Sequence, residues 1–481
     1  MNIEDCPMTT THAHNMTPHH TVPFAPLQHL MVASRPDAYP VAFHGQACVT
    51  WSTWQADVYH LAEALRQHPA KRWALCFDDS YHFAVAFMAA AHADKHLILP
   101  GNHQPEALAE LSPHFDALLH DRPHYAQLTC PQWTASALLS EQSPEQRDAP
   151  STAQPVFGEL CLSALPLTLF TSGSSGTPKA IEKTLAELAA EVEHHERTWG
   201  VTLAGSRIVS TVSHQHIYGL LFRILWPLCA GRVFARQDLV YPEQVIAQAE
   251  ADTTLVTSPA LLKRLSDEQC DRAYRAVYSS GGPLSFDAAQ SSQRLFAQWP
   301  VEVYGSTETG GIAHRQQTDP QIPWQVFDVI EATVNAERCL RIRSPFVDAG
   351  QWYQTSDQCQ LLAERQFILQ GRVDRVVKIE EKRISLTEVE ARLCQLPWVD
   401  EAAVLVLEDA RRVSLGAVLT LTQEGEAELI RLGKGAFWLA LRQALRSWLE
   451  PVGIPRRFRV VAEIPLNSQG KRLMRDLEQL F

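Results

Sequence analysis

One glycine- and serine-rich loop limits most strongly what this chain can fold into. An apolar run at residues 165–170 predicts a buried strand, which leads into the loop and its last residues, Pro178 and Lys179. A capping box at Thr184 and Glu187 predicts that a helix follows. Converging backbone N–H groups, hydroxyl donors and a lysine suit a phosphate group. The pattern predicts an anion-binding loop between strand and helix, with a flexible Ser/Gly linker as the alternative.

The rest of the chain alternates short apolar runs with amphipathic stretches, as α/β proteins do. Strands are predicted at 73–77, 96–100, 253–258, 275–280 and 301–305, and helices at 51–67, at 82–93 and from Pro259 onward. The predicted fold class is α/β, with a large N-terminal domain of helix-covered, mostly parallel sheets. No lysine directly follows Gly176, so the loop is not a Walker A motif, which disfavours a P-loop kinase or ATPase.

The pattern changes after residue 371, where a capping box at Ser385 and Glu388 opens a helix. Further strands are predicted at 402–407, 413–421 and 457–464, and a helix at 436–449. These elements predict a small C-terminal α+β domain. We divide the chain into a flexible His-, Pro- and Thr-rich lead-in (1–38), a core domain (39–371) and the C-terminal domain (372–481). Metal binding is the alternative for the histidines of the lead-in.

Charge and composition exclude several classes of partner. Lysine and arginine total 42 and aspartate and glutamate 54, so 42 minus 54 gives −12, the wrong sign for attraction to nucleic acid or anionic lipid. No apolar run approaches the roughly 18 residues of a membrane span, and the N-terminus does not resemble a signal peptide. We expect a cytoplasmic protein without a membrane span or a nucleic-acid partner. The ten cysteines lack CxxC spacing and are expected to be reduced thiols.

The loop at 171–179 matches the TSGSSGxPK signature of the adenylate-forming ligases, and the chain resembles that family. The family includes acyl-CoA synthetases, aryl-acid ligases, firefly luciferase and the adenylation domains of peptide synthetases. Its later motifs follow in the family's order: the histidine-centred segment at 214–220, YGxTE at 304–308, TGD with serine for glycine at 355–357, GRxD at 371–374 and PxxxxGK at 465–471. The resemblance runs from about residue 39 to the end. It implies an AMP-forming acid ligase that uses ATP and Mg²⁺.

Activation of a carboxylic acid by ATP brings two anions together, so positive charge and a metal ion must offset their repulsion. We expect Glu308 to bind Mg²⁺ through the ATP phosphates and Thr307 to donate to the α-phosphate, as the resemblance also implies; a surface turn is the alternative. We expect Asp357 to accept hydrogen bonds from the ribose, although a turn aspartate would look the same. The predicted ATP-binding residues are Thr171, Ser172, Gly173, Ser174, Ser175, Gly176, Lys179, Gly281, Gly282, Tyr304, Asp357 and Arg372.

The resemblance assigns further residues. Lys471, otherwise a solvated lysine of a polar loop, is implied to be catalytic, entering the site during adenylation to offset developing charge. Asp374 falls at the family's hinge, about which the small domain rotates. His216 is implied to gate the acyl pocket, with a satisfied core histidine as the alternative. Arg383 is either a phosphate contact or part of a surface ion pair.

Two features bear on the substrate and the acceptor. The segment 213–220 lacks the aspartate that peptide-synthetase adenylation domains usually carry there, which leaves a fatty, short-chain or aromatic acid. Glu381 stands where the family has a glycine that lines the pantetheine tunnel, so free coenzyme A is expected to be obstructed. We therefore expect transfer to the phosphopantetheine thiol of an acyl carrier protein, as in the ligases of aryl-polyene clusters that this segment resembles. The alternatives are a conventional acyl-CoA synthetase and a degenerate nucleotide-binding module without turnover.

Overall fold

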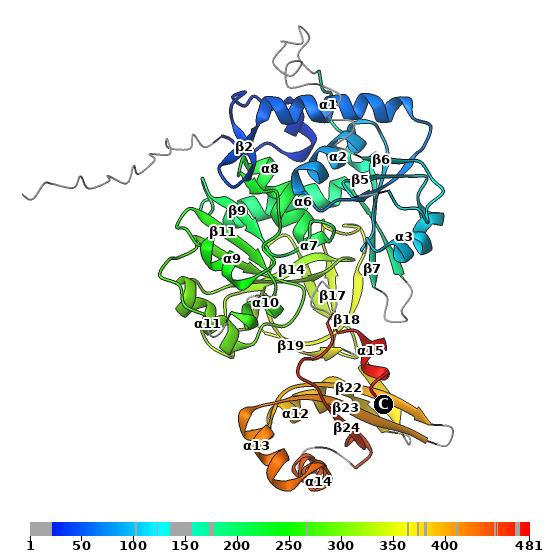
Figure 1. The fold of residues 1–481 in the computed structure, drawn as a ribbon, viewed down its shortest axis with the longest axis vertical. Coiled ribbons are helices and arrows are strands. Elements are labelled where there is room, and N and C mark those ends of the chain that lie inside the picture. Colours follow the sequence, from blue (N-terminus) through cyan, green and yellow to red (C-terminus); the bar gives the residue numbers. More distant parts are fainter. Residues whose placement is uncertain are drawn as a thin grey trace, which may run out of the picture.

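The computed structural model contains a large domain of two sheets and helices and a small C-terminal domain (Figure 1). It describes residues 22–101, 103–122, 124–134, 156–172, 178–265, 268–362, 365–372, 375–379, 382–409, 412–446, 449, 451–466 and 472–481. Residues 1–21 of the predicted lead-in thus lie outside the described residues. The prediction of a flexible lead-in is wrong for residues 22–38, because Leu27, Leu30 and Met31 are buried in the core of the large domain. The predicted α/β fold class is confirmed. Within these ranges, no helix combines the length and apolar character that a membrane crossing requires.

The first sheet of the large domain has six strands. Their order is β6 (Gln132–Thr134), β5 (Ala117–His120), β3 (Arg72–Cys76), β4 (His96–Leu99), β7 (Pro166–Ser172) and β8 (Pro178–Thr184). All neighbouring pairs are parallel except β7 and β8. Helices α1 (Trp51–Gln67) and α2 (Ser80–His92) precede and follow β3. This is the alternation that the sequence predicts for this region.

The second sheet has thirteen strands. Their order is β16 (Glu331–Val334), β17 (Cys339–Arg343), β18 (Tyr353–Leu361), β19 (Gln366–Arg372), β15 (Trp324–Val326), β14 (Gly310–Arg315), β13 (Val301–Ser306), β12 (Ala276–Ser279), β11 (Thr253–Thr257), β9 (Arg207–Ser210), β10 (Phe234–Ala235), β1 (Pro40–His44) and β2 (Ala47–Thr50). Pairing is parallel from β13 to β1 and antiparallel from β13 to β16 and between β1 and β2. The predicted strands at 253–258, 275–280 and 301–305 form β11, β12 and β13, whereas β9, β10 and β1 of the parallel region and the antiparallel strands were not predicted.

The glycine-rich loop joins two strands, which differs from the prediction. Strand β8 pairs antiparallel with β7, with Thr171 opposite Lys179, before helix α6 (Leu185–Trp199) begins. The predicted capping box is present, since Thr184 accepts from the Glu187 N–H and the Glu187 carboxylate accepts from the Thr184 N–H. β8 escaped prediction because lysine and glutamate occupy positions that one expects to be apolar in a strand. The loop is thus a hairpin loop, not a helix N-terminus.

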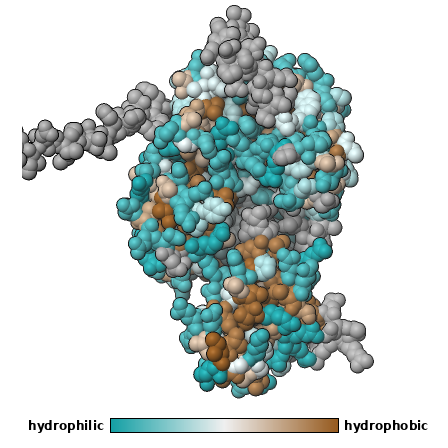
Figure 2. All heavy atoms as spheres, viewed as in Figure 1, coloured by the Kyte–Doolittle hydropathy of each residue, from teal (hydrophilic) through white to brown (hydrophobic). Residues whose placement is uncertain are grey.

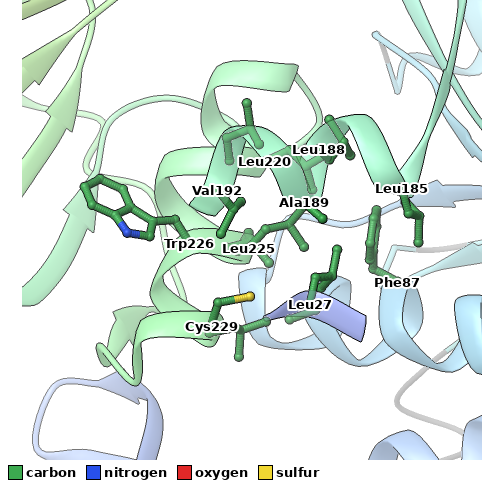
Figure 3. Close-up of a cluster of buried hydrophobic side chains, with 14 of the residues drawn as sticks. Leu27, Phe87, Leu185, Leu188, Ala189, Val192, Leu220, Leu225, Trp226 and Cys229 are labelled. Atoms are coloured by element: carbon green, nitrogen blue, oxygen red, sulfur yellow. The ribbon is translucent and has the colours of Figure 1, made fainter. Parts of the chain in front are cut away.

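Helix α6 is held by an apolar cluster (Figure 3). Its residues Leu185, Leu188, Ala189 and Val192 belong to a buried cluster that the figure also draws with Leu27, Phe87, Leu220, Leu225, Trp226 and Cys229. The partners come from the helical segments Leu27–Val32, α2, Leu220–Leu225 and α8 (Trp226–Ala230). The remaining helices of the large domain are α3 (Pro105–Leu111), α7 (Ile217–Gly219), α9 (Pro242–Ala247), α10 (Pro259–Arg264) and α11 (Phe286–Phe296). Packing on this scale fixes the position of α6 within the large domain.

The C-terminal domain has a core of its own. Its elements are β20 (Val376–Ile379), β21 (Lys382–Ser385), α12 (Leu386–Cys394), β22 (Val399–Asp409), β23 (Arg412–Leu421), α13 (Gln423–Leu432), α14 (Lys434–Leu445), β24 (Arg457–Val460) and α15 (Met474–Glu478). Strands β22, β23 and β24 form one sheet, and the helix α13 was not predicted. Buried residues between 379 and 458 form one cluster that takes no residue from the large domain.

Two surface features of the C-terminal domain stand out. Figure 2 shows hydrophobic residues gathered on its visible face, and its exposed large apolar side chains include Ile430 and Leu439. An ion pair also reaches the large domain, since the Lys263 Nζ on α10 lies 3.1 Å from Asp400 Oδ2 and 2.7 Å from Glu401 Oε1 on β22. These charges connect the two domains directly. The described cysteines are free thiols.

Candidate active site

The predicted site residues gather at the carboxyl ends of parallel strands. Thr171 and Ser172 end β7, and Gly281 and Gly282 follow β12. Tyr304 lies near the end of β13, and the Ser280 hydroxyl beside these glycines donates to the Val303 carbonyl at 2.8 Å. Ligands of α/β proteins bind at this edge of a sheet. These predicted residues thus lie at the carboxyl ends of strands from both sheets of the large domain.

An ion pair joins the two sheets at this edge. The Lys179 Nζ on β8 lies 2.7 Å from Oε1 of Glu308, in the turn between β13 and β14. Burial opposes ionisation of Glu308, but the hydrogen bond from Lys179, backbone donors and the lysine charge prevail, and the pKa of Glu308 is lowered. The same hydrogen bond and charge raise the pKa of Lys179. Both groups are therefore charged at neutral pH, and a phosphate that attracts Lys179 would release the Glu308 carboxylate.

A second ion pair connects neighbouring strands of the larger sheet. The Arg372 Nη1 on β19 lies 3.0 Å from Oδ1 of Asp357 on β18, where the two residues face each other in register. The Asp357 N–H donates to the Thr355 hydroxyl at 3.1 Å, which fixes the backbone at this position. Burial and then the charge of Asp357 raise the pKa of the Tyr304 phenol. The carboxylate is 17% exposed, so it can accept hydrogen bonds from hydroxyl groups of a ligand.

The phenol of Tyr353 is within electrostatic reach of both ion pairs, and sequence analysis did not find this residue. Burial raises the pKa of its phenol, the charges of Glu308 and Asp357 add to this, and Lys179 and Arg372 oppose it. All four charged groups of the two ion pairs therefore influence the pKa of this one side chain. The available signal was its spacing: residues 353 and 357 of one strand point to the same face of a sheet.

The turn that carries Thr307 and Glu308 is cross-linked internally. The Ser306 N–H donates to the Thr309 hydroxyl at 3.0 Å, and the Thr309 N–H donates to the Ser306 hydroxyl at 3.2 Å. Thr307 and Glu308 stay partly exposed between these two residues. Two buried ionisable residues outside the prediction, Lys183 and Glu191, also contact this Ser306–Gly311 turn.

The two histidines of the segment 214–220 differ in environment. His214 is buried: its Nδ1 lies 2.9 Å from the Ser80 hydroxyl and its Nε2 lies 3.1 Å from the Phe77 carbonyl oxygen. Burial lowers the pKa of His214, so it stays a neutral core residue. His216 is partly exposed and lies beside Gly101, whose added Cβ would come within 3.8 Å of the His216 Cε1 and 2.5 Å of the Phe170 carbonyl oxygen. His216 therefore lies next to the start of the glycine-rich loop.

Several predicted residues lie outside the described part of the chain, and their assignments stay predictions. These are Gly173, Ser174, Ser175, Gly176, Asp374, Glu381 and Lys471. The side chains of Ser172 and Arg383 also lie outside it. The observed contacts thus form two ion pairs, Lys179 with Glu308 and Arg372 with Asp357, and the charges of these pairs also act on the phenols of Tyr304 and Tyr353.

The donor set at Glu308 suits magnesium held largely by substrate. Within the described residues, no three His, Cys, Asp or Glu side chains lie together as a metal-binding group. Magnesium usually keeps several waters and binds one or two carboxylates together with substrate phosphates. One partly exposed carboxylate beside a lysine that is predicted to bind phosphate fits that pattern. Glu308 would hold the ion, which would polarise the phosphate oxygens.

Sequence comparisons give the family and the relatives that this chain resembles. A family model described as AMP-binding enzyme matches residues 31–330. The 4-coumarate-CoA ligase of Rhodobacter capsulatus is 24% identical over 302 residues, which cover 63% of this chain and 73% of the relative. Malpinin synthetase of Mortierella alpina is 27% identical over 525 residues, which cover 93% of this chain and 6% of that protein.

A solved structure agrees in fold. The chain resembles ATP-bound MatB from Rhodopseudomonas palustris with a TM-score of 0.76 at 16% sequence identity, covering 95% of this chain and 99% of that one. At this identity the likeness establishes the shared fold.

Proposed function

The chain belongs to the AMP-binding enzyme family, and from that premise we propose that it activates a carboxylic acid with ATP and passes the acyl group to a pantetheine thiol. The observation that carries the proposal is the Lys179–Glu308 ion pair at the end of the glycine-rich loop. It places a cation for phosphate and a carboxylate for Mg²⁺ within hydrogen-bond distance. Asp357 supports it as the acceptor of the ribose hydroxyls.

In the first reaction, a carboxylate oxygen of the acid attacks the α-phosphorus of ATP. A P–O bond forms, the bond from the α-phosphorus to the bridging oxygen breaks, and pyrophosphate leaves with the electron pair. Lys179 neutralises phosphate charge, Thr307 donates to the α-phosphate, and Lys471 offsets the charge that develops as both anions meet. Tyr304 and the backbone of Gly281 and Gly282 border the adenine.

In the second reaction, the sulfur of a pantetheine thiol attacks the acyl carbon of the adenylate. A C–S bond forms, the C–O bond to AMP breaks, AMP leaves with the electron pair, and the thiol proton passes to solvent. Rotation of residues 372–481 about Asp374, relative to a core of 39–371, would exchange the groups that serve the two reactions. His216, beside Gly101, would then separate the acid pocket from the thiol channel.

Coenzyme A is the acceptor that the comparisons favour, which revises the expectation of a carrier protein. The Rhodobacter capsulatus relative is named a CoA ligase, and so is the mitochondrial malonate-CoA ligase of Mus musculus, which is 22% identical over 386 residues. The argument for a carrier protein rests on Glu381, which lies outside the described residues. The acid belongs to the fatty, short-chain or aromatic classes. We place the enzyme in the cytoplasm, where ATP is supplied.

A pyrophosphate-exchange screen across aliphatic, hydroxy and aromatic acids tests the first reaction. Acid-dependent exchange is expected for at least one class, whereas ATP hydrolysis to ADP without exchange would contradict the proposal. Thioester formation with coenzyme A and with a phosphopantetheinylated carrier protein, at matched concentrations, then decides the acceptor. We expect coenzyme A to be acylated. A faster reaction with the carrier protein than with coenzyme A would favour a carrier protein as the acceptor. In that case Glu381→Gly should reduce the difference between the two rates.

A further inference from the structure

Two buried ionisable residues contact the backbone of the Ser306–Gly311 turn at different positions, and the reaction described above does not use either of them. Lys183 comes from β8 and Glu191 from α6. Lys183 contacts the backbone of Glu308 and Glu191 contacts the backbone of Gly311, so the two residues hold the two ends of the segment 308–311.

Lys183 fixes the backbone of Glu308. Its Nζ donates to the carbonyl oxygen of Glu308 at 3.0 Å and to that of Phe346 at 2.8 Å, and its side chain is 2% exposed. A buried ammonium is costly unless hydrogen bonds satisfy it, so these carbonyls must stay in place. Lys183 stands four residues after Lys179 on the same strand, so both point to one face of β8. One lysine thus contacts the carboxylate of Glu308 and the other its carbonyl.

Glu191 fixes the other end of the turn. Its Oε1 accepts the Gly311 N–H at 2.7 Å. An added Cβ on Gly310 would lie 2.5 Å from the Glu191 Oε2, and Gly310 has a φ of +66°, in the left-handed region that favours glycine. The apolar cluster of Figure 3 anchors α6, so Glu191 is presented by a fixed helix.

We propose that Lys183 and Glu191 are positioning residues that hold the Glu308 carboxylate in place for magnesium-bound ATP. When phosphate attracts Lys179, Glu308 loses the partner that holds its side chain. Lys183 and Glu191 still hold the backbone on both sides, so the carboxylate does not follow the lysine. The inference rests on the proposed role of Glu308 and adds the residues that make this role possible.

The chain provides a matched control for a purely structural role. Arg232 is also a buried cation: its side chain is 4% exposed and pairs with Glu196 of α6 at 2.8 Å. It donates to the carbonyl oxygens of Leu203 at 2.9 Å and Gly200 at 3.0 Å. Lys183 and Arg232 thus share burial, a glutamate of the same helix nearby and two backbone acceptors, but the contacts of Arg232 lie away from the turn.

The experiment compares the full-length protein with Lys183→Met, Lys183→Arg, Glu191→Gln, Glu191→Met and Arg232→Met. Thermal melting reports folding, and pyrophosphate exchange gives kcat and KM for magnesium-ATP. Calorimetry measures ATP binding with Mg²⁺ and with a chelator. Lys183→Met is expected to weaken the binding of magnesium-ATP by about 10- to 100-fold, which is the usual effect of losing a residue that orients a metal ligand. ATP affinity without Mg²⁺ should stay close to that of the unmodified protein.

The comparison between variants decides the inference. Glu191→Gln keeps an oxygen that can accept the Gly311 N–H and should change the magnesium dependence little, whereas Glu191→Met should shift it in the same direction as Lys183→Met. Lys183→Arg should recover most of the loss. Arg232→Met should lower the melting temperature without changing the magnesium dependence. Equal magnesium dependence of Lys183→Met and Arg232→Met would overturn the positioning role.

A failure of the proposed function gives a different result. If no acid supports exchange, acid activation is wrong, yet the calorimetry still compares the variants. If Mg²⁺ does not change the ATP affinity of the unmodified protein, the role of Glu308 fails and the inference fails with it.

Discussion

Asp357 is the residue whose replacement tests the nucleotide assignment most directly. Its carboxylate faces Arg372 and lies near Tyr304. Asp357→Ala should raise the Kd for ATP by about 10- to 100-fold, because a hydrogen bond to a charged group contributes about 1.5–3 kcal/mol. Calorimetric titration of ATP measures this. Glu331→Ala is the control, since Glu331 pairs with Arg343 at 2.6 Å in the same sheet but outside the predicted site. Equal Kd values for both variants would mean that the ribose is misplaced.

At the same scale, Glu191 makes stability depend on pH. Burial raises the pKa of its carboxyl from the ordinary 4.5 to about 7, although the hydrogen bond from the Gly311 N–H and the charge of Lys183 both act to lower this pKa. The folded protein therefore keeps a proton that the unfolded chain loses, and the free energy of unfolding falls as pH rises through this window. The size of this effect is about 3 kcal/mol. Burial lowers the pKa of the neighbouring His195, which acts in the opposite direction.

The difference in the free energy of unfolding between Glu191→Gln and the unmodified protein isolates the contribution of Glu191, because His195 is present in both proteins. The variant should gain stability relative to the unmodified protein between about pH 5 and about pH 8. Urea unfolding at several pH values measures the difference. A difference that does not change with pH would show that Glu191 ionises normally.

At the scale of elements, sequence patterns predicted those helices and strands whose chemistry is local. The capping box at Thr184 and Glu187 placed the start of α6 correctly, and residues 51–67 form α1 as predicted. β8 was missed because its sequence is polar. Lys179 pairs with Glu308 and Lys183 donates to the carbonyl oxygens of Glu308 and Phe346, and a local pattern cannot reveal partners so distant in the sequence. Without β8, the same-face spacing of the two lysines could not be seen.

Among the residues of the candidate site, too, only those that belong to a local sequence pattern could be predicted. Residues that belong to short motifs, such as Glu308 and Asp357, could be proposed from sequence. Tyr353 and Glu191 belong to no motif, and their proximity to the site depends on strand pairing and on the packing of α6. Long-range pairing is what local periodicity does not encode.

The contact between α10 and β22 gives a prediction about elements of different domains. Lys263→Glu should repel Asp400 and Glu401 and reduce the population of the observed domain arrangement. The total stability should change little, because exposed ion pairs contribute about 0–1 kcal/mol. Small-angle X-ray scattering is expected to show a changed distance distribution. Arg272→Glu, which breaks the exposed pair with Glu250 within the large domain, should leave the distribution unchanged. Identical scattering of both variants would contradict an orienting role for Lys263.

For the whole molecule, separate cores predict separate unfolding. The C-terminal cluster between 379 and 458 shares no residue with the clusters of the large domain. We expect calorimetry to show two transitions, since chains with several domains depart from two-state behaviour. ATP at about 100 times its Kd should stabilise the large domain by about 2.7 kcal/mol and shift its transition. A single transition that moves as a whole with ATP would indicate that the two domains unfold as one unit.

The close contact of α6 with the β13–β14 hairpin also restricts how this protein can evolve. A methyl group at position 311 would lie 2.8 Å from Phe327 Cε2 and 3.0 Å from Glu191 Oε1. A larger residue at 311 is therefore acceptable only after positions 191 and 327 have become smaller. Among homologous sequences, these three positions should change together and in that order. Because replacement of Glu191 would loosen the turn that holds Glu308, this order passes through a weakened protein, and glycine should rarely be replaced at position 311.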